Sequence, residues 1–206
     1  LSVAREVSCK VIYFQDPVSM WYQGSQLLPH LDVLTNEFLV DQIGDLRPFF
    51  FGQSSGAYAS LVAATRFPTA RVLACAPQVV SDRLAKQNII FSRQIAVQYS
   101  PDCLENVPEL WRGAQEDGPE AAVIFSVSEW GNPVGSHFWM DFSHSLQMAG
   151  IPGVAVFLVR NNIHAVVHRN SKVFSKIISA LISSGAKINS QIDEIRDSLD
   201  EMSVSS

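Results

Sequence analysis

The residues of this chain with the clearest chemical meaning stand in a short run, GQSSG at positions 52–56. A serine with a glycine two residues to either side is the pattern of a nucleophile carried on a sharp turn between a strand and a helix. Residues 47–51 (RPFFF) indicate the strand, and residues 57–66 (AYASLVAATR) indicate the helix. The run therefore predicts that the Ser54 hydroxyl attacks a carbonyl carbon.

The geometry of such a turn makes two further demands on the sequence. Its tight path leaves no room for side chains at the flanking positions, which explains glycine at 52 and at 56. The same path holds the serine in a strained backbone conformation. We also expect Ser54 to lie at the amino end of the following helix, where free N–H groups and the helix dipole stabilise a developing negative charge.

The order of strand, GQSSG, helix and a second strand in RVLACAPQ resembles the nucleophile-elbow region of the α/β-hydrolase superfamily. More narrowly, the chain from residue 12 (IYFQDPVSMWY) to residue 78 resembles small bacterial hydrolase-like proteins that carry a G-x-S-x-G-G-Y-A-A-L segment. The likeness covers about a third of the chain. Ala57 stands where those relatives have a second glycine.

The resemblance implies that a histidine accepts the proton of the serine and that it follows the last strand. His164 fits this position, because it comes after the strand-like residues 153–160 (GVAVFLVR) and a short polar turn. His168, four residues further on, is the alternative. We expect His164 to be the general base.

The third member of such a site holds the imidazole in its working tautomer and lies on the loop after the preceding strand. Residues 121–128 (AAVIFSVS) indicate that strand, and Glu129 is the only acid in the segment that follows it. The resemblance implies aspartate at this place, which the segment lacks. Glu129 is therefore the expected acid, with Asn132 as the polar alternative and Asp141, in a predicted helix, as a further one.

The resemblance also implies an oxyanion hole made of two backbone N–H groups. One belongs to Ser55, directly after the nucleophile. The other is expected at Gln15 or Asp16, where the strand-like residues VIYF end. Gln53 is expected to contact the substrate, and Trp21 and Tyr22 are expected either to line the acyl pocket or to belong to the core.

These residues together predict a serine hydrolase that acts on a small-molecule acyl ester or related carbonyl substrate, without a cofactor or metal. Two alternatives remain open: an acyltransferase or thioesterase-like enzyme using the same site, and a hydrolase fold kept for binding or scaffolding without catalysis. The three cysteines, Cys9, Cys75 and Cys103, do not have metal-ligand spacing, and their odd number favours a reducing, cytoplasmic location.

Five short apolar runs would position this site, and each is rich in Val, Ile or Phe. They are residues 10–14, 48–51, 71–76, 121–127 and 154–159. Near-continuous apolar runs are typical of parallel strands covered on both faces, and helical spacing between them supplies the covering helices. The pattern predicts an α/β fold with an open, mostly parallel sheet of about five to six strands and helices on both faces.

Residues 1–185 are expected to form this domain, with residues 79–120 as a lid or pocket wall, because that connection is unusually long. Residues 186–206 predict an amphipathic helix and tail. An apolar stripe there either docks on the domain or mediates homo-oligomerisation, and its members are Ile188, Ile192, Ile195, Leu199 and Met202.

The charge of the chain excludes one class of partner. The 206 residues carry a formal net charge of -5, and the basic residues are scattered, so the chain lacks the basic surface that a nucleic-acid backbone requires. The sequence also contains no run of the roughly 20 apolar residues that would span a bilayer. A globular domain with a small-molecule substrate fits both observations.

Overall fold

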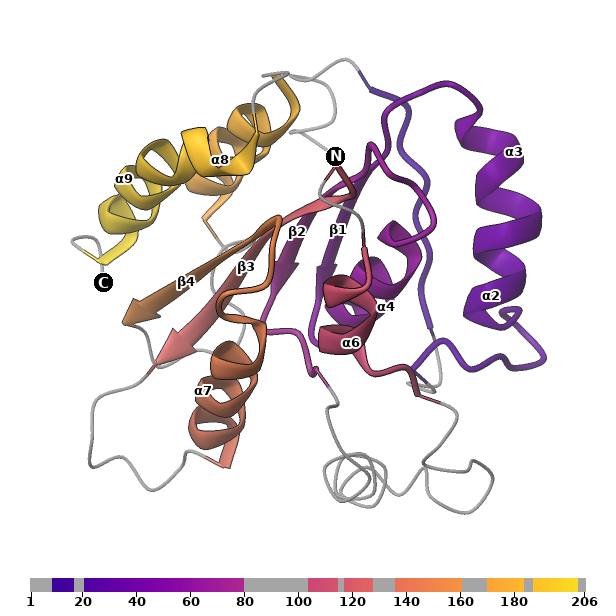
Figure 1. Cartoon of the computed structure of the whole chain (residues 1–206), viewed down its shortest axis with the longest axis horizontal. Coiled ribbons are helices and arrows are strands. Elements are labelled where there is room, and N and C mark those ends of the chain that lie inside the picture. Colours follow the sequence, from indigo (N-terminus) through magenta and orange to yellow (C-terminus); the bar gives the residue numbers. More distant parts are fainter. Residues whose placement is uncertain are drawn as a thin grey trace.

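A parallel sheet forms the centre of the fold. The computed structural model describes residues 9–16, 21–79, 104–114, 117–127, 136–160, 170–183 and 187–203. In this part of the chain four strands lie in the order β1-β2-β3-β4, all parallel (Figure 1). They are β1 (Phe49–Gln53), β2 (Arg71–Cys75), β3 (Glu120–Val127) and β4 (Val154–Arg160).

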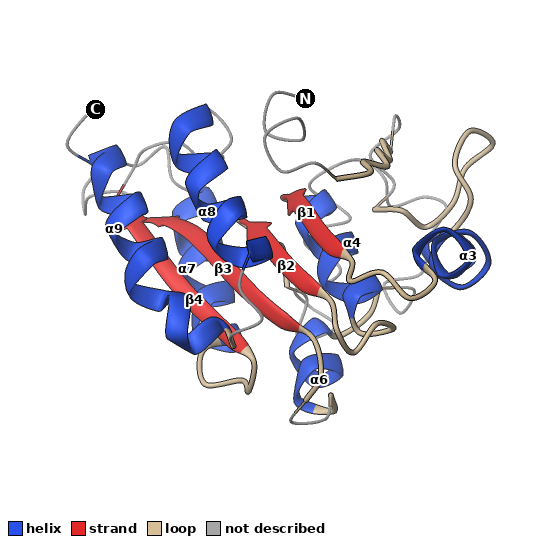
Figure 2. Ribbon diagram, turned by 90° about the horizontal axis from the view of Figure 1, so that it is seen from above, coloured by secondary structure: helices blue, strands red, loops and turns tan. Residues whose placement is uncertain are grey.

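Helices cover both faces of this sheet, as the apolar strands require. Side chains alternate along β2, so that Val72 and Ala74 join one hydrophobic core while Leu73 and Cys75 join the other. Figure 2 shows the sheet between the two layers. The first layer contains α4 (Ser55–Ala64), α6 (Val107–Arg112) and α7 (Ser136–Met148), and the second contains α8 (Ser171–Ser183) and α9 (Ile192–Ser203). The predicted α/β class with a parallel, helix-flanked sheet is confirmed.

The prediction of a strand at residues 10–14 is wrong, and four strands rather than five or six are seen in the described chain. The segment is extended but joins no sheet, and Val11 and Tyr13 are 53% and 80% exposed. Its contacts go to a helix instead: the rings of Phe14 and Phe38 meet edge to face at 5.8 Å, and the Lys10 Nζ donates a hydrogen bond to Gln42. Apolar composition indicated an extended chain without indicating its partner.

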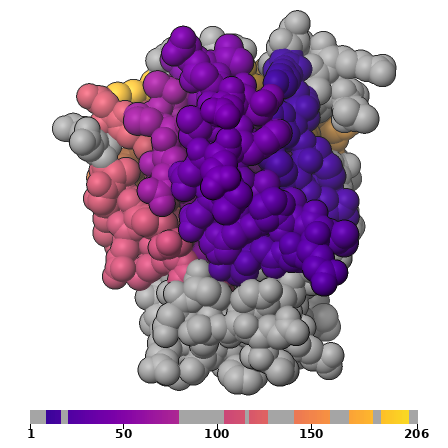
Figure 3. All heavy atoms as spheres, turned by 90° about the vertical axis from the view of Figure 1, so that its right-hand side faces the viewer, coloured from indigo at the N-terminus to yellow at the C-terminus, as the bar shows by residue number. Residues whose placement is uncertain are grey.

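That helix is one continuous segment made of α2 (Leu31–Val33), the π-helix η1 (Leu34–Leu39) and α3 (Val40–Ile43). This helix lies on the side of the sheet that β1 borders (Figure 1). Residues from the amino-terminal part of the chain occupy the centre of the face seen in Figure 3. Leu31, Leu34 and Leu39 are buried. The helix therefore holds residues 10–14 near β1, although these residues add no strand to the sheet.

The long connection between β2 and β3 packs partly against α4, the helix that follows Ser54. Trp111 of α6 is buried, and its indole N–H donates to the Leu61 carbonyl of α4 at 3.1 Å. The Glu105 backbone N–H donates to the Tyr58 hydroxyl at 2.8 Å. Residues 80–103 and 115–116 of the predicted lid or pocket wall lie outside the described residues. The described part of the connection packs on α4, and its role as a lid or pocket wall stays a prediction.

The carboxyl-terminal residues pack on their own domain. After the short 3-10 helix η4 (Ile188–Gln191), the α9 helix lies against α8 and β4, and Ile188, Ile195 and Leu199 are buried in the second core. Ile192 packs against the same core. These four side chains lie where the docking alternative expects them. Self-association through this segment stays a prediction.

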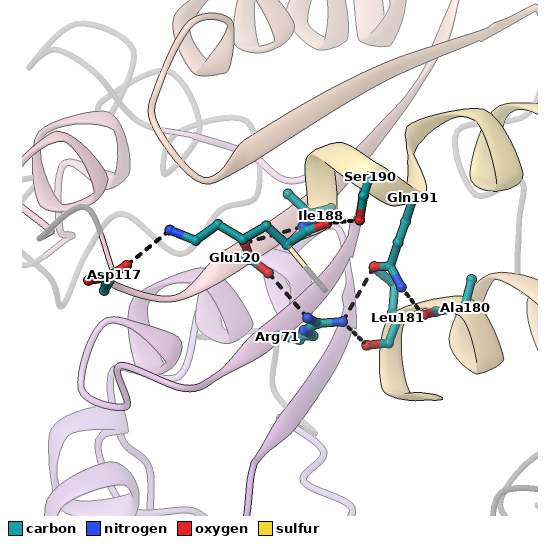
Figure 4. Close-up of polar contacts among 9 residues, drawn as sticks. Arg71, Asp117, Glu120, Ala180, Leu181, Ile188, Ser190 and Gln191 are labelled. Carbon is teal, nitrogen blue, oxygen red and sulfur yellow. Dashed lines mark hydrogen bonds and ion pairs between the residues drawn. The ribbon is translucent and has the colours of Figure 1, made fainter. Parts of the chain in front are cut away.

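A buried arginine anchors this tail at the amino edge of the sheet (Figure 4). The Arg71 guanidinium donates to the Leu181 carbonyl at 2.6 Å and to the Gln191 amide oxygen at 3.3 Å. It also lies 3.5 Å from the Glu120 carboxylate, whose other oxygen accepts the Ile188 backbone N–H at 3.2 Å. β2, β3 and the tail are thereby joined through one hydrogen-bonded ion pair. None of the helices in the described part of the chain is long and apolar enough to cross a membrane.

Candidate functional site

Ser54 occupies the turn that the sequence predicted. It lies between the end of β1 and the first residue of α4, with backbone angles of φ 53° and ψ −119°. For a residue with a side chain this conformation costs about 1–3 kcal/mol, which the surrounding structure must supply. The strained serine between strand and helix is therefore confirmed.

Of the two flanking glycines, only Gly52 is required by close packing. A Cβ atom at Gly52 would lie 2.1 Å from the Gly56 carbonyl oxygen and 2.6 Å from the Ala57 nitrogen. At Gly56 the nearest atom to such a Cβ would be the Tyr22 hydroxyl at 3.8 Å, an ordinary contact. The expectation that neither glycine leaves room for a side chain is thus correct at 52 and wrong at 56.

Backbone hydrogen bonds hold the turn in place. The Ser54 N–H donates to the Cys75 carbonyl at 2.9 Å, which ties the turn to the end of β2. The Ser54 carbonyl accepts from Ala57 and Tyr58 at 3.0 and 3.1 Å and so starts α4. At a helix start the N–H groups of the first residues, here Ser55 and Gly56, have no acceptor within the helix.

The Ser54 side chain is not used to cap the helix that it precedes. Ser54 is the N-cap residue of α4, yet its side chain makes no capping hydrogen bond. The residue is half-buried, as are Gln53 and Ser55 on either side. The hydroxyl therefore stands at a helix amino terminus, partly open to solvent and beside the N–H groups that favour an anion.

Trp21 and Tyr22 contact α4, whereas the expected role of the Gln15 or Asp16 N–H in the oxyanion hole stays a prediction. The Asp16 carboxylate accepts the Tyr22 backbone N–H at 3.1 Å, whereas Gln15 is exposed. Trp21 is buried and packs edge to face on Tyr58 of α4, with ring centroids 5.5 Å apart. Trp21 thus belongs to the first hydrophobic core and Tyr22 packs against it, while substrate contact by either residue stays a prediction.

Backbone strain gathers at this end of the molecule. In the described chain the non-glycine residues with positive φ are Trp21, Tyr22, Ser54 and Ala76. Ala76 follows β2 directly, beside the Cys75 carbonyl that holds Ser54, and the other two contact α4. Strained residues of this kind persist where surrounding contacts over-determine them, and they cluster at functional sites.

One residue at this edge was missed by the sequence analysis. Gln78, three residues after the end of β2, is 2% exposed, and within the described chain its amide oxygen has no hydrogen-bond partner. A buried acceptor without a donor is costly and rare. The signal available in the sequence was a single amide directly after an apolar strand, next to Pro77.

The remaining predicted members of the site lie outside the described residues: Glu129, Asn132, His164 and His168. The strands before them are described, since β3 ends at Val127 and β4 at Arg160, at the same edge of the sheet as Ser54. Asp141 is buried in the middle of α7.

Ionisation at the site is shaped mainly by burial. Burial raises the pKa of the Cys75 thiol to about 12, so this thiol stays protonated and is no competing nucleophile. The pKa of the Tyr22 phenol is raised by burial and, to a lesser degree, by the nearby Asp16 carboxylate. Within the described ranges no three His, Cys, Asp or Glu side chains gather as a metal site.

Comparisons with protein families and with curated proteins found no match for this chain. The likeness to the hydrolase elbow therefore rests on the residues themselves, above all on the turn around Ser54.

Proposed function

We propose that this protein is a serine hydrolase that cleaves an acyl ester or a related carbonyl substrate through an acyl-enzyme at Ser54. The observation that carries the proposal is the conformation of Ser54 between β1 and α4, at φ 53° and ψ −119°. A chain accepts such strain where it exposes a nucleophile at a helix amino terminus. The absence of a capping bond from the Ser54 side chain supports the same role.

In the first half of the reaction, the Ser54 oxygen forms a bond to the carbonyl carbon while its proton passes to the imidazole of His164. The carbonyl π electrons move onto the oxygen, and the N–H groups of Ser55 and Gly56 stabilise the resulting oxyanion. The intermediate collapses when the alcohol leaves with the proton from the imidazole. Water then attacks the acyl-enzyme by the same steps and releases the acid.

The strand order is compatible with this assignment. Three strand spacings, roughly 14 Å, separate β1 from β4. The four residues from Arg160 to His164 span up to roughly 14 Å when extended, and the imidazole adds further reach. The proposal therefore requires the chain after β4 to turn back over the carboxyl ends of β3 and β2. Glu129, two residues past β3, would then lie on the way between them.

The test is turnover of p-nitrophenyl acetate by the wild type and two matched serine variants. Ser54→Ala should lower kcat by about 10⁶-fold, whereas Ser55→Ala, which keeps its backbone N–H, should retain most of the activity. An added acceptor alcohol distinguishes hydrolysis from acyl transfer, because only a transferase forms the new ester. A folded wild type without turnover, or a Ser54→Ala variant that keeps it, would overturn the proposal.

A further inference from the structure

The turn at Trp21 and Tyr22 is the most strained element of the site after Ser54. Two consecutive residues with large aromatic side chains have φ angles of 57° and 60°, a region that favours glycine. This conformation costs free energy at each of the two residues. Glycine at these positions would avoid this cost. The strain is therefore accepted because it places the two aromatic side chains.

Three contacts hold the turn in this conformation. The Asp16 carboxylate accepts the Tyr22 N–H at 3.1 Å, and the Tyr22 carbonyl accepts the Leu31 N–H at 2.7 Å. The buried Trp21 ring packs on Tyr58 of α4. The Tyr22 backbone and the neighbouring Trp21 ring are thus held by partners from three other segments.

The phenol points to the start of the nucleophile helix. Its hydroxyl would lie 3.8 Å from a Cβ atom at Gly56, two residues after Ser54. The only acceptor described for it, the Phe14 carbonyl, is 3.5 Å away, at the far limit of a hydrogen bond. The hydroxyl therefore lies close to Gly56, the second residue of α4.

We infer that the Tyr22 hydroxyl donates a hydrogen bond to the oxyanion formed when Ser54 attacks the substrate carbonyl, as a side-chain member of the oxyanion hole. The inference rests on the proposed function of Ser54. As the bond from the Ser54 oxygen to the carbonyl carbon forms, the carbonyl π electrons move to the oxygen, and the phenol exchanges its long bond to Phe14 for a short one to this anion. The phenolic proton stays on Tyr22 throughout.

The ionisation of Tyr22 is consistent with this role. Burial first, and the Asp16 carboxylate second, raise the pKa of the phenol above its usual value near 10. Because the neutral form is favoured, the hydroxyl remains a donor across the pH range in which a histidine base is effective. It becomes a repelling anion only in strongly alkaline solution.

The test compares Tyr22→Phe, which keeps the ring and removes the hydroxyl, with Tyr13→Phe, which removes a hydroxyl from an exposed ring. With p-nitrophenyl acetate, kcat of Tyr22→Phe should fall by about 10²-fold while KM changes by less than about twofold. Inhibition by phenylboronic acid, which forms a tetrahedral adduct with the serine, should weaken by a similar factor. Tyr13→Phe should match the wild type in both measurements.

The outcomes separate this inference from the proposed function. An active wild type whose Tyr22→Phe variant stays within about threefold in kcat overturns the role of the hydroxyl and leaves Ser54 as proposed. An inactive, folded wild type overturns both. If Tyr22→Phe melts well below the wild type, the pH profile of the wild type decides: a fall in kcat above the ordinary tyrosine pKa supports the inference, and a flat profile in the folded protein overturns it.

Discussion

At the amino edge of the sheet the buried Arg71 is matched by Glu120 and Gln191, whereas at the carboxyl edge strained residues gather around Ser54. Gln78 adds a buried amide oxygen that, within the described chain, has no donor. The first edge satisfies its polar groups and contributes stability; the second keeps conformations and groups that cost stability. Because a fold retains destabilising conformations mainly where they position functional groups, this difference favours the carboxyl edge as the functional site.

Among the changes that distinguish the two edges, we expect the largest loss of kcat from a change of Glu129, the proposed acid of the site. Glu129→Gln removes the charge that stabilises the imidazolium of His164, and kcat should fall by about 10⁴-fold with KM nearly unchanged. Steady-state kinetics on p-nitrophenyl acetate measures both. Asn132→Ala, in the same segment, should do little. Retained activity in the first variant and lost activity in the second would assign the third member to the neutral amide.

At the amino edge, a change should affect stability and leave chemistry alone. Arg71→Met leaves the Glu120 carboxylate without its cation and the Gln191 amide without a donor. The free energy of unfolding should fall by about 3–5 kcal/mol, as measured by urea denaturation. Lys176→Met, which breaks an exposed pair with Glu201, is the control and should leave the free energy of unfolding nearly unchanged. A large loss of kcat in folded Arg71→Met would contradict the division between the two edges.

The smallest expected effect is a gain in stability at the carboxyl edge. If this gain is not observed, the carboxyl edge does not differ from the amino edge in the way described. Ser54→Gly removes the strain at φ 53°, so the protein should gain about 1 kcal/mol while losing its activity. The melting temperature should rise by about 2–4 °C in calorimetry. Ser55→Gly is the control: this residue is the first of α4, where glycine is less favourable, and its melting temperature should fall. A lower melting temperature for Ser54→Gly would show that the turn stores no strain.

Local sequence sufficed for the turn around Ser54 because its determinants are local. The structure has the strand, the close packing at Gly52 and the helix, although the strand ends at Gln53 and the helix begins at Ser55 rather than after Gly56. The strand expected at residues 10–14 was wrong because an apolar extended run does not reveal whether it will meet a strand or a helix. The role of the stripe in α9 was left open for the same reason, since periodicity predicts a buried face and not its partner.

The strained aromatic turn at Trp21 and Tyr22 could not have been predicted from the sequence. Aromatic residues have no propensity for positive φ, so nothing in the residues at 21 and 22 indicates such a turn. It exists because Asp16 and Leu31 bond its backbone and Tyr58 packs on its ring, and these partners come from three different segments. Tertiary contacts of this kind override local preference.

The most direct test of the account is covalent labelling by a fluorophosphonate probe, followed by peptide mass mapping. Ser54 occupies the strained turn with its side chain free of a capping bond, whereas Ser55 is already the first helical residue. The account predicts that the folded protein is labelled on Ser54, that Ser54→Ala is not labelled, and that Ser55→Ala is labelled like the wild type. Label on Ser55, or no label on the folded wild type, would contradict the account and favour a hydrolase-like fold that binds without catalysis.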